Sequence, residues 1–396
     1  MGGDSIYTIA KLHWAFPPII GGVETHLTLL CPELIRRGYN LHLLTGAVNG
    51  EPEEFDFHGM RVRRHRFLDL NSLSPQIIKE NRRQIKDLLH SFLDEVNPEI
   101  IHLHNMHYFS PDHLEFLVEY KNHRKKPLVL TAHNVWEDEL WQEMLTFKDE
   151  WDYVIAVSDF IKKELIRFGF DGEKIITVHH GIDTEKFKPG ISPDNPYAKM
   201  EFFAGKKVIF HPARMSFAKG SDYAVKAFAE VQKLFPDTVL VMAGTKKTVD
   251  WGGVQQKEVQ EIMKLVEEYG LSDKVYVQFF NWQEIHWMYE IADICIYPSS
   301  FEEPFGLVML EAMASGKPII VTNSGGMPEV VQDGVNGFVI PKKDASALAR
   351  KLILLLEDDE LRRRMGESGR KLAEEKFTVK VMTDNTEKVY QKMLKH

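Results

Sequence analysis

The sequence predicts an α/β fold with parallel sheets, divided between two domains. Short apolar runs typical of buried strands alternate with longer stretches of helical periodicity along the whole chain. The length of 396 residues corresponds to two or three domains at roughly 150 residues each. A non-periodic segment with several prolines and glycines, 189–205, separates two such series. We expect an N-terminal domain over 1–188, a linker over 189–205 and a C-terminal domain over 206–376.

The first series begins with a strand over 6–12 and a helix that ends near Gly38. Further strands are predicted over 41–45, 61–67, 100–104, 128–132, 154–157 and 175–178, with helices over 76–96 and from Ser158. The second series has predicted strands over 207–211, 239–244, 275–279, 294–297 and 319–322. Its predicted helices span 255–269, 285–291, 307–314, 345–356 and 360–376, and a further helix lies within 377–396.

Composition excludes several classes of protein. Hydrophobic residues make up 44% and charged residues 27%, which is ordinary for a globular protein. The net charge of −9 argues against general affinity for nucleic acid or anionic membranes, so a phosphate ligand needs local cations. Cys31 and Cys295 are far apart and fit a reducing cytoplasm as small buried hydrophobes. We see no secretory leader and no apolar run of about 18 residues, and expect a cytoplasmic protein.

Two carboxylates, Glu303 and Glu311, flank the most informative stretch of the chain. Pro304 and Gly306 between them suit a loop that turns into a helix. The N-terminus of that helix, over 305–307, would present free N–H groups to an anion. A wholly helical spacing would separate the carboxylates by roughly 12 Å, about the reach needed to hold hydroxyls on both sides of a diphosphate. Glutamates are usually solvated, but Glu311 lies within an apolar run, which weakens that interpretation for it.

Other candidate ligand-binding residues lie in loops that follow predicted strands. Arg214 and Lys219 follow the strand 207–211, where an arginine can grip phosphate oxygens and a lysine supplies a point charge. Gly21 and Gly22 lie between a strand and a helix, and either form a plain tight turn or allow a ligand to approach the backbone. His133 follows the strand 128–132 and is either a satisfied rim histidine or a ligand contact.

Two further clusters have alternative interpretations. His102, His104 and His107 suggest metal ligands, but residues two apart on a strand do not converge as a tetrahedral site requires, so contacts to an acceptor are favoured. The arginines of 61–66 form either a solvated strand face or a basic patch for an anionic acceptor or a membrane surface. The acidic run 357–360 falls in a helix connection and is interpreted as solvated surface.

Read as an ordered set, these motifs resemble those of the retaining GT-B glycosyltransferases of family 4, also called glycosyl transferases group 1. The E-x(7)-E signature and its surroundings match at Ser299, Glu303, Phe305, Gly306, Leu307, Glu311, Ala312, Gly316, Pro318, Gly325, Gly326, Glu329, Gly334 and Gly337. The family's R-x(4)-K-G pattern matches from Arg214 to Gly220, with Ala213 where a glycine is common. His180 stands where the family commonly has an asparagine. The resemblance covers nearly the whole chain and is strongest over 208–341.

The resemblance implies two Rossmann-like domains with parallel sheets facing a central cleft, and a last helix, 377–396, that crosses back to the N-terminal domain. It implies carbohydrate biosynthesis by transfer of a sugar from a nucleotide-diphosphate sugar to an acceptor hydroxyl, with retention at the anomeric carbon. The acceptor would be a small molecule, a sugar, or a lipid or polysaccharide precursor. The leaving phosphate would accept the proton. No cofactor and no metal is expected, because Arg214 and Lys219 would neutralise the diphosphate.

The same resemblance implies roles for single residues. His133 would line the reacting face, Glu303 would hold donor-sugar hydroxyls, and Glu311 would hold the ribose. Arg214, Lys219 and the helix N-terminus would take the diphosphate charge. Further donor contacts are expected at Gly21, Gly22, Asn281, Phe305, Gly306 and Leu307. Acceptor contacts are expected at His104, Asn105 and Trp136.

Three alternatives share parts of this pattern. The first is a disaccharide synthase or phosphorylase of the same fold, of the trehalose- or sucrose-phosphate type. The second is a UDP-sugar 2-epimerase-type enzyme, which would not bring the two motifs together. The third is a non-catalytic nucleotide-sugar-binding module. The expected partners are a nucleotide-sugar and a hydroxyl-bearing acceptor, and not nucleic acid. Peripheral contact with the inner face of a membrane and the oligomeric state stay open.

Overall fold

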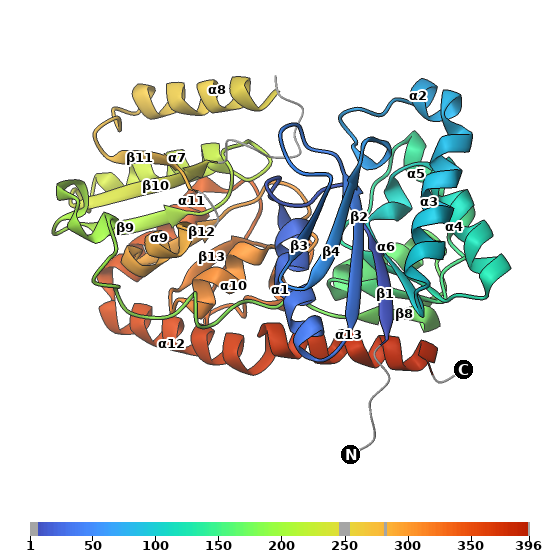
Figure 1. Ribbon diagram of the computed structural model, residues 1–396. Coiled ribbons are helices and arrows are strands. Elements are labelled where there is room, and N and C mark those ends of the chain that lie inside the picture. The colour runs from blue at the N-terminus through green and yellow to red at the C-terminus, as the bar shows by residue number, and fades with distance from the viewer. Residues whose placement is uncertain (1–6, 245–253, 281–282, 395–396) are drawn as a thin grey trace, which may run out of the picture. The chain divides into compact units, whose positions relative to one another are not determined.

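A computed structural model describes residues 7–244, 254–280 and 283–394. The chain forms two compact units, coloured along the chain in Figure 1. Unit 1 comprises Met1–His180 and Val379–His396, and unit 2 comprises Gly181–Thr378. The segment 189–205, for which we expect a linker, lies in unit 2 and contains two short 3-10 turns, Tyr197–Lys199 and Glu201–Phe203.

Within the described residues, unit 1 contains an eight-stranded sheet in the order β3-β4-β2-β1-β5-β6-β7-β8. All of its pairs are parallel except β3 with β4. The strands are β1 (Thr8–Leu12), β2 (Asn40–Gly46), β3 (Glu54–Phe57), β4 (Met60–His65), β5 (Ile100–His104), β6 (Leu128–Ala132), β7 (Tyr153–Ala156) and β8 (Ile175–Thr177). Strand β3 is an addition to the sequence prediction. It forms a hairpin whose turn places His58 and Gly59 at positive φ, with the Gly59 N–H donating to Asp56.

The helices of unit 1 are α1 (Gly22–Arg36), α2 (Pro75–Glu80), α3 (Arg82–Val96), α4 (Pro111–Arg124), α5 (Glu139–Met144), α6 (Asp159–Arg167) and α13 (Val379–Leu394). The single helix predicted over 76–96 is wrong, because it is two helices separated at Asn81. The side chain of Asn81 donates to the Ile77 carbonyl and its backbone leaves helical geometry, as asparagine often does at a helix end. The predicted strand 61–67 ends at His65 and continues as a 3-10 turn, Arg66–Leu68.

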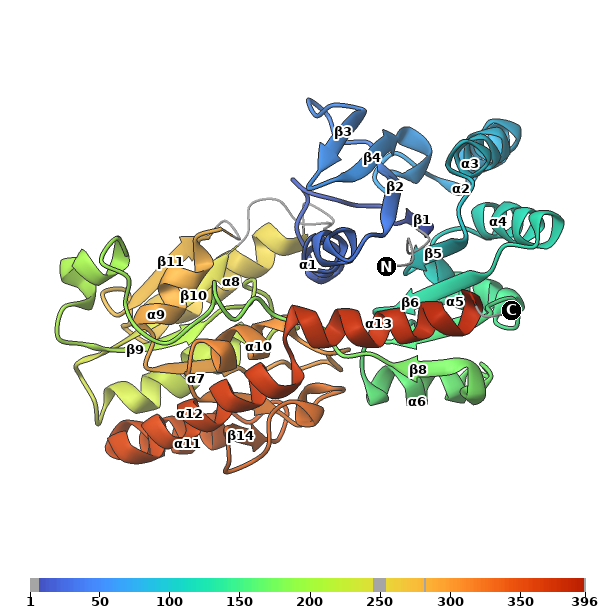
Figure 2. The same cartoon turned by 60° about the horizontal axis from the view of Figure 1, so that its bottom comes forward.

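Helix α13 completes the core of unit 1 although it comes from the end of the chain. It packs against α1 and β7 (Figure 2). Met382, Val389 and Tyr390 of α13 are buried in one cluster with residues of α1 and β1, including Cys31 and Ile9. Unit 1 is therefore built from two segments that are separated in sequence by the whole of unit 2.

Unit 2 contains a parallel sheet of six described strands in the order β11-β10-β9-β12-β13-β14. The strands are β9 (Lys207–His211), β10 (Thr238–Gly244), β11 (Val275–Phe279), β12 (Ile294–Tyr297), β13 (Ile319–Thr322) and β14 (Gly337–Ile340). The helices are α7 (Ser221–Gln232), α8 (Val254–Glu268), α9 (Ile285–Ile291), α10 (Leu307–Ala314), α11 (Ala345–Glu357) and α12 (Asp359–Lys376). This unit has its own apolar core, in which α7 and α11 pack on the sheet.

Both sheets reverse their strand order beside their first strand, between β1 and β5 in unit 1 and between β9 and β12 in unit 2. Open parallel sheets bind ligands at the carboxyl ends of strands at such a point. The loops that leave β1, β5 and β6 carry Gly21, Asn105 and His133, and those that leave β9 and β12 carry Lys219 and Glu303. No helix within the described residues is long and apolar enough to cross a membrane.

Candidate functional site

Glu303 is the centre of a buried polar cluster in unit 2. Its carboxylate is 4% exposed, so the solvated interpretation does not apply. Its Oε1 lies 2.7 Å from the Lys219 ammonium and accepts a hydrogen bond of 2.5 Å from the Tyr297 hydroxyl. Ser299 Oγ lies 3.1 Å from the same oxygen. A carboxylate with these donors is held in one orientation.

A glycine turn holds the backbone of Glu303. Gly326 donates its N–H to the Glu303 carbonyl at 2.8 Å, and the Glu303 N–H donates to Ser324 Oγ at 3.1 Å. Gly325 has a φ of +50°, and a Cβ there would lie 2.0 Å from the Glu303 carbonyl oxygen. Gly325 is thus required by the close approach of two loops.

The loop after β9 brings two cations toward Glu303. Gly220 has a φ of +74°, and a Cβ there would meet the Pro298 carbonyl oxygen at 1.8 Å, so this loop packs tightly on the end of β12. Lys219 reaches Glu303 and also lies 4.7 Å from the centre of the Phe301 ring. Desolvation lowers the pKa of Arg214, and Tyr297, Glu258 and Glu303 act on it in the opposite direction. The structure thus brings together the Arg214–Lys219 pair and Glu303.

Helix α10 begins at Leu307, as predicted. Gly306 precedes it with a φ of +94°, and no side chain of the described residues caps this N-terminus. Phe305 is buried, at 1% exposed, and contacts Phe377. The first N–H groups of α10 therefore come directly after the loop that carries Glu303. Uncapped N–H groups at a helix N-terminus can bind an anion.

Glu311 lies one turn into α10 and is half-buried. Its Oε2 accepts a hydrogen bond of 2.7 Å from the Tyr289 hydroxyl. Desolvation raises the pKa of Glu311, while Tyr289 and Lys186 oppose that rise. Tyr289 and Tyr297 are site residues that the sequence analysis missed. Tyr297 is the last residue of β12, and that position at a strand end was the signal available for it.

In unit 1, α1 begins at Gly22 without a side-chain cap among the described residues. A Cβ on Gly21 would lie 2.6 Å from Glu24 Oε2, and Glu24 Oε1 lies 3.0 Å from His13 Nε2. Glu24 and His13 are both buried, and sequence reasoning identified neither. The glycine pair is thus close to a buried carboxylate as well as to a helix N-terminus.

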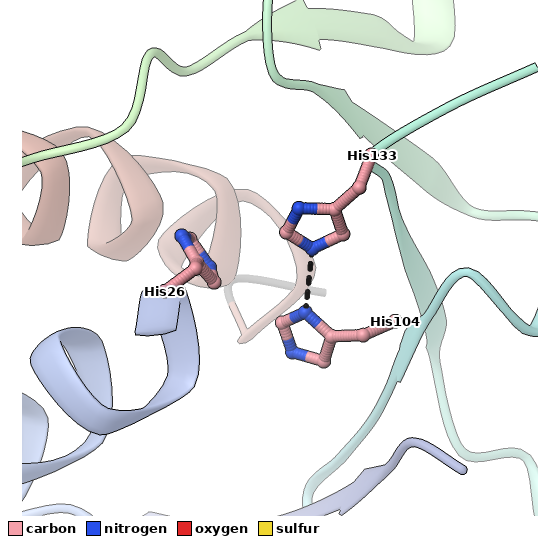
Figure 3. A group of neighbouring side chains, drawn as sticks. All are labelled: His26, His104 and His133. Atoms are coloured by element: carbon pink, nitrogen blue, oxygen red, sulfur yellow. Dashed lines mark hydrogen bonds between the residues drawn. The ribbon is translucent and has the colours of Figure 1, made fainter. Parts of the chain in front are cut away.

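Four buried histidines gather at the carboxyl ends of β5 and β6. His104 Nδ1 lies 3.2 Å from His133 Nε2, and His26 Nδ1 lies 2.9 Å from His180 Nδ1. Figure 3 shows His26 on α1 facing the pair formed by His104 and His133. Desolvation lowers the pKa of His26, His104 and His133 well below the usual value, and the pKa of His180 to about 3. These imidazoles are therefore neutral at pH 7.

One ring nitrogen of each of His26, His104 and His133 lies within 4.8 Å of the others, which is the separation of potential metal ligands. The surroundings of His104 do not suit a metal. A metal-bound histidine normally donates its other N–H to an acceptor, but the other nitrogen of His104 lies 3.3 Å from the Lys11 amine, a donor. The predicted group of His102, His104 and His107 is also dispersed, since His102 bonds Thr131 and His107 bonds the Asn134 carbonyl.

The other two expected acceptor contacts, Asn105 and Trp136, also have partners within unit 1. Asn105 Oδ1 accepts from the His133 backbone N–H at 2.8 Å. Trp136 is half-buried and stacks on Tyr108, with ring centres 3.9 Å apart. Asn281, expected near the base, lies outside the described residues.

Two of the four arginines in the basic segment 61–66 have partners within unit 1. Arg63 pairs with Glu54 and Glu95, and the buried Arg64 donates to the Pro52 and Pro17 carbonyls. Arg61 and Arg66 are exposed. Only these two therefore remain for the basic-patch interpretation of 61–66.

Comparison with known proteins identifies a common family. Residues 197–372 match the family described as "Glycosyl transferases group 1", and residues 20–186 match "Glycosyltransferase Family 4". The putative glycosyltransferase YtcC of Bacillus subtilis is 30% identical over 67% of this chain and 67% of its own. The uncharacterized glycosyltransferase MJ1607 of Methanocaldococcus jannaschii is 25% identical over 96% and 97%. Spore coat protein SA of Bacillus subtilis is 30% identical over 60% of this chain, and the match spans 64% of that protein.

Solved structures share the fold at lower identity. Sucrose-phosphate synthase from Thermosynechococcus elongatus superposes with a TM-score of 0.83 and 20% identity, over 98% of this chain and 99% of that chain. The HepE protein of Anabaena, solved with UDP and glucose, superposes with a TM-score of 0.79 and 20% identity, over 97% and 99%. These likenesses show the fold of this chain, two α/β domains with parallel sheets.

Proposed function

Because this chain belongs to the glycosyl transferases group 1 family and has the GT-B fold, we propose that it transfers a hexosyl group with retention at the anomeric carbon. Nucleotide-sugar transfer is the activity of the family, and the retaining course is our proposal. The observation that carries it is the buried Glu303 carboxylate, held by Lys219 and Tyr297 beside Arg214. The acceptor is a hydroxyl of a small molecule, a sugar, or a lipid or polysaccharide precursor, and the setting is the cytoplasm.

The chemical requirement is to stabilise a departing diphosphate beside an oxocarbenium-like centre. Arg214, Lys219 and the free N–H groups at the start of α10 supply positive charge for the diphosphate. Their donors are oriented before the ligand arrives, so little reorganisation is needed as charge develops. The leaving phosphate accepts the proton of the acceptor hydroxyl. Two protein cations neutralise the diphosphate, so the reaction requires no metal and no cofactor.

In this proposal the two carboxylates contact different parts of the nucleotide-sugar donor. Glu303 accepts hydrogen bonds from hydroxyls of the donor sugar while Lys219 and Tyr297 keep it in place. Glu311 accepts from the ribose, and the Tyr289 hydroxyl orients it. Phe305, Gly306 and Leu307 shape the loop and helix start against the diphosphate. Asn281 stays an expected contact of the base.

Unit 1 supplies the remaining contacts in this proposal. Gly21 and Gly22 offer backbone N–H groups at the start of α1, and His133 contacts the donor sugar. Asn105 and Trp136 are the acceptor candidates, whereas both ring nitrogens of the buried His104 are engaged by Lys11 and His133. Asn105 already holds the His133 backbone, so its contribution to an acceptor is through the second lone pair of its carbonyl oxygen or through its amide.

The test is turnover across UDP-, GDP- and ADP-sugars, measured as release of nucleoside diphosphate with and without chelator. We expect release from one donor, unchanged by chelator, and a product with the anomeric configuration of the donor by NMR. Glu303→Gln should lower kcat by about 100-fold, the size found when one oriented polar group of such a site is removed. Glu268→Gln on α8, exposed and paired only at the surface with Lys264, is the matched control and should keep full activity.

Other results would point elsewhere. Nucleotide-sugar binding without turnover, unaffected by Glu303→Gln, would indicate a binding module. Failure to bind any nucleotide-sugar would move the assignment to a phosphorylase that uses a sugar phosphate. An inverted product would refute the retaining course while leaving transfer intact.

A further inference from the structure

A chain of buried polar side chains in unit 1 connects α13 to His133. It comprises Tyr390 on α13, Lys11 on β1, His102 and His104 on β5, and His133 after β6. Lys11, His102, His104 and Tyr390 are all 0% exposed. Buried polar groups of this kind must satisfy one another, so the position of each proton can be derived from its neighbours.

Lys11 is the starting point, because an ammonium can only donate. Its Nζ has three neighbours within the described residues: His102 Nδ1 at 2.9 Å, Tyr390 Oη at 3.2 Å and His104 Nε2 at 3.3 Å. An ammonium has three N–H groups, one for each of them. Burial lowers the pKa of Lys11 to about 8, so the group is still largely protonated at pH 7.

His102 is consistent with this assignment. The single lone pair of its Nδ1 is shared between the Lys11 ammonium at 2.9 Å and the Tyr390 hydroxyl at 2.6 Å. The proton of the neutral ring is therefore on Nε2, and Nε2–H donates to Thr131 Oγ1 at 2.7 Å. The ring thus has a donor or an acceptor opposite each nitrogen.

The same logic continues through His104 to His133. His104 Nε2 accepts from Lys11, so the proton of His104 is on Nδ1, which donates to His133 Nε2 at 3.2 Å. His133 Nε2 is then an acceptor, and its own proton is on Nδ1. That Nδ1 is buried and has no hydrogen-bond partner among the described residues. The neighbouring His26 and His180 rings contact His133 edge-on and by stacking, respectively.

We propose that Lys11 and His104 are positioning residues that hold His133 as its Nδ1–H tautomer, so that it presents one neutral N–H donor to a hydroxyl oxygen of the sugar substrate. The identity of that ligand rests on the proposed function, whereas the tautomer does not. In this state Nδ1 already carries a proton and Nε2 is engaged by His104. His133 therefore cannot take a proton from the acceptor hydroxyl, and it binds and orients the sugar instead.

The direct test is to observe the ring nitrogens of His133 in the full-length, ligand-free protein labelled with ¹⁵N-histidine. Long-range ¹H–¹⁵N correlation distinguishes a protonated from an unprotonated ring nitrogen, and the His133→Gln variant assigns the signals. We expect a protonated Nδ1 and an unprotonated Nε2. A protonated Nε2 in the unmodified protein would overturn the proposal.

The role of Lys11 is tested with Lys11→Met, which keeps most of the length of the side chain and removes its donors. We expect His104 to lose its fixed tautomer and the His133 signals to shift toward a mixture. Lys79→Met, at an exposed position on α2, is the control and should leave the His133 signals unchanged. Unchanged His133 signals in folded Lys11→Met would refute the role of Lys11.

A second pair of variants guards against failure of Lys11→Met to fold. His104→Asn places an amide N–H near the position of Nδ1, whereas His104→Leu removes the donor. With a nucleotide-sugar that is turned over, His104→Leu should lower kcat/KM by about 10-fold, as for one lost neutral hydrogen bond, and His104→Asn should restore most of it. Equal activity of the two variants would refute the role of His104. If no nucleotide-sugar is turned over, the proposed function fails, but the NMR result still decides the tautomer.

Discussion

At the scale of single residues, the two carboxylates of unit 2 have a common arrangement. Each accepts a hydrogen bond from a buried tyrosine, Tyr297 for Glu303 and Tyr289 for Glu311. Glu303 also has a lysine ammonium, that of Lys219, in direct contact at 2.7 Å. Glu311 is the carboxylate whose charge is disfavoured by its surroundings, because desolvation raises its pKa.

Donor affinity should depend on pH through Glu311. In the proposed function the ribose hydroxyls would donate to the ionised carboxylate, so binding would require Glu311 to lose its proton. Because its pKa is raised in the free protein, affinity should be full above that pKa and fall as the pH decreases through it. Calorimetry with the preferred donor, from about pH 8 to about pH 5, covers the range of a raised carboxyl pKa. Glu311→Gln should remove this dependence, and a variant that keeps it would show that another group titrates.

Gly325 should be needed for activity because of its contact with Glu303. In Gly325→Ala the new methyl group would overlap the Glu303 carbonyl oxygen, so the loop must move and the carboxylate with it. We expect kcat to fall by at least about 10-fold, since small displacements of an oriented group are costly. Gly334→Ala is the matched control, because Gly334 also has a positive φ but no atom within 4 Å of the added Cβ. Equal activity of the two variants would contradict this account of the glycine turn.

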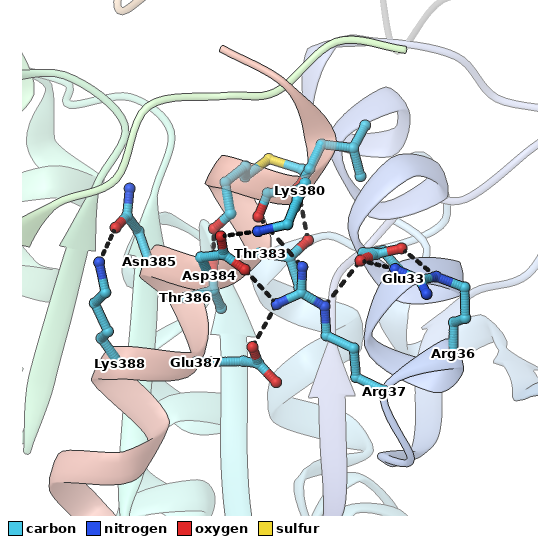
Figure 4. A network of polar contacts seen from close by, with 12 residues as sticks. Glu33, Arg36, Arg37, Lys380, Thr383, Asp384, Asn385, Thr386, Glu387 and Lys388 are labelled. Atoms are coloured by element: carbon cyan, nitrogen blue, oxygen red, sulfur yellow. Dashed lines mark hydrogen bonds and ion pairs between the residues drawn. The ribbon is translucent and has the colours of Figure 1, made fainter. Parts of the chain in front are cut away.

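At the scale of elements, Arg37 at the end of α1 connects that helix to α13 (Figure 4). Its guanidinium donates to Asp384 at 2.7 Å and to Glu387 on α13, and to Glu33 on α1 at 2.8 Å. These partners raise the pKa of Arg37 further above its usual value. The side chain is only 16% exposed, so this network is better shielded from water than an ordinary surface pair.

Arg37→Met should therefore destabilise unit 1. The loss of charge-assisted hydrogen bonds to three carboxylates should lower the free energy of unfolding by about 2 kcal/mol. Arg36→Met is the control, because Arg36 is 70% exposed and pairs only with Glu33 among the described residues. It should leave the urea midpoint almost unchanged, because exposed ion pairs contribute little. Urea unfolding of both variants measures the difference, and equal midpoints would show that the Arg37 network contributes nothing.

The elements predicted best are those whose pattern is local. The strands β10, β12 and β13 are almost wholly apolar, buried runs, and the start of α10 follows from Pro304 and Gly306. The sequence predicted only the second strand of the hairpin formed by β3 and β4. Strand β3 is short and half-exposed, so its periodicity is weak. The break at Asn81 depends on one side-chain hydrogen bond, and nothing in the periodicity of 76–96 marks it.

The candidate site was predictable only in part, for a related reason. Glu303 and Lys219 were identified through a motif, but their direct contact spans 84 positions. Lys11 interrupts an apolar strand, and its partners lie 91 to 379 positions away, so its burial could not be seen from its own neighbours in the sequence. Buried polar networks depend on tertiary packing, which local propensity does not encode.

At the scale of the whole molecule, each unit has its own core, but only unit 2 is continuous in sequence. A chain that ends at Thr378 should retain the core of unit 2 and lose the buried side chains of Met382, Val389 and Tyr390 from unit 1. Each large apolar side chain removed from a core costs about 2–5 kcal/mol, so unit 1 should unfold in such a chain. Pulse proteolysis should then degrade 7–180 and spare 181–378. Survival of both segments would show that α13 is dispensable.

The origin of α13 at the far end of the chain has a consequence for biosynthesis. Domains usually fold in the order in which they leave the ribosome, N-terminal first. Here the first 180 residues emerge early, but unit 1 is incomplete until α13 has been translated. Gly181–Thr378 has all of its own strands and helices before that point. Until α13 has been translated, the unit 1 side chains in its cluster, including Ile9 and Cys31, lack their partners on α13. We therefore expect Gly181–Thr378, which is translated later than Met1–His180, to complete its fold before unit 1 does.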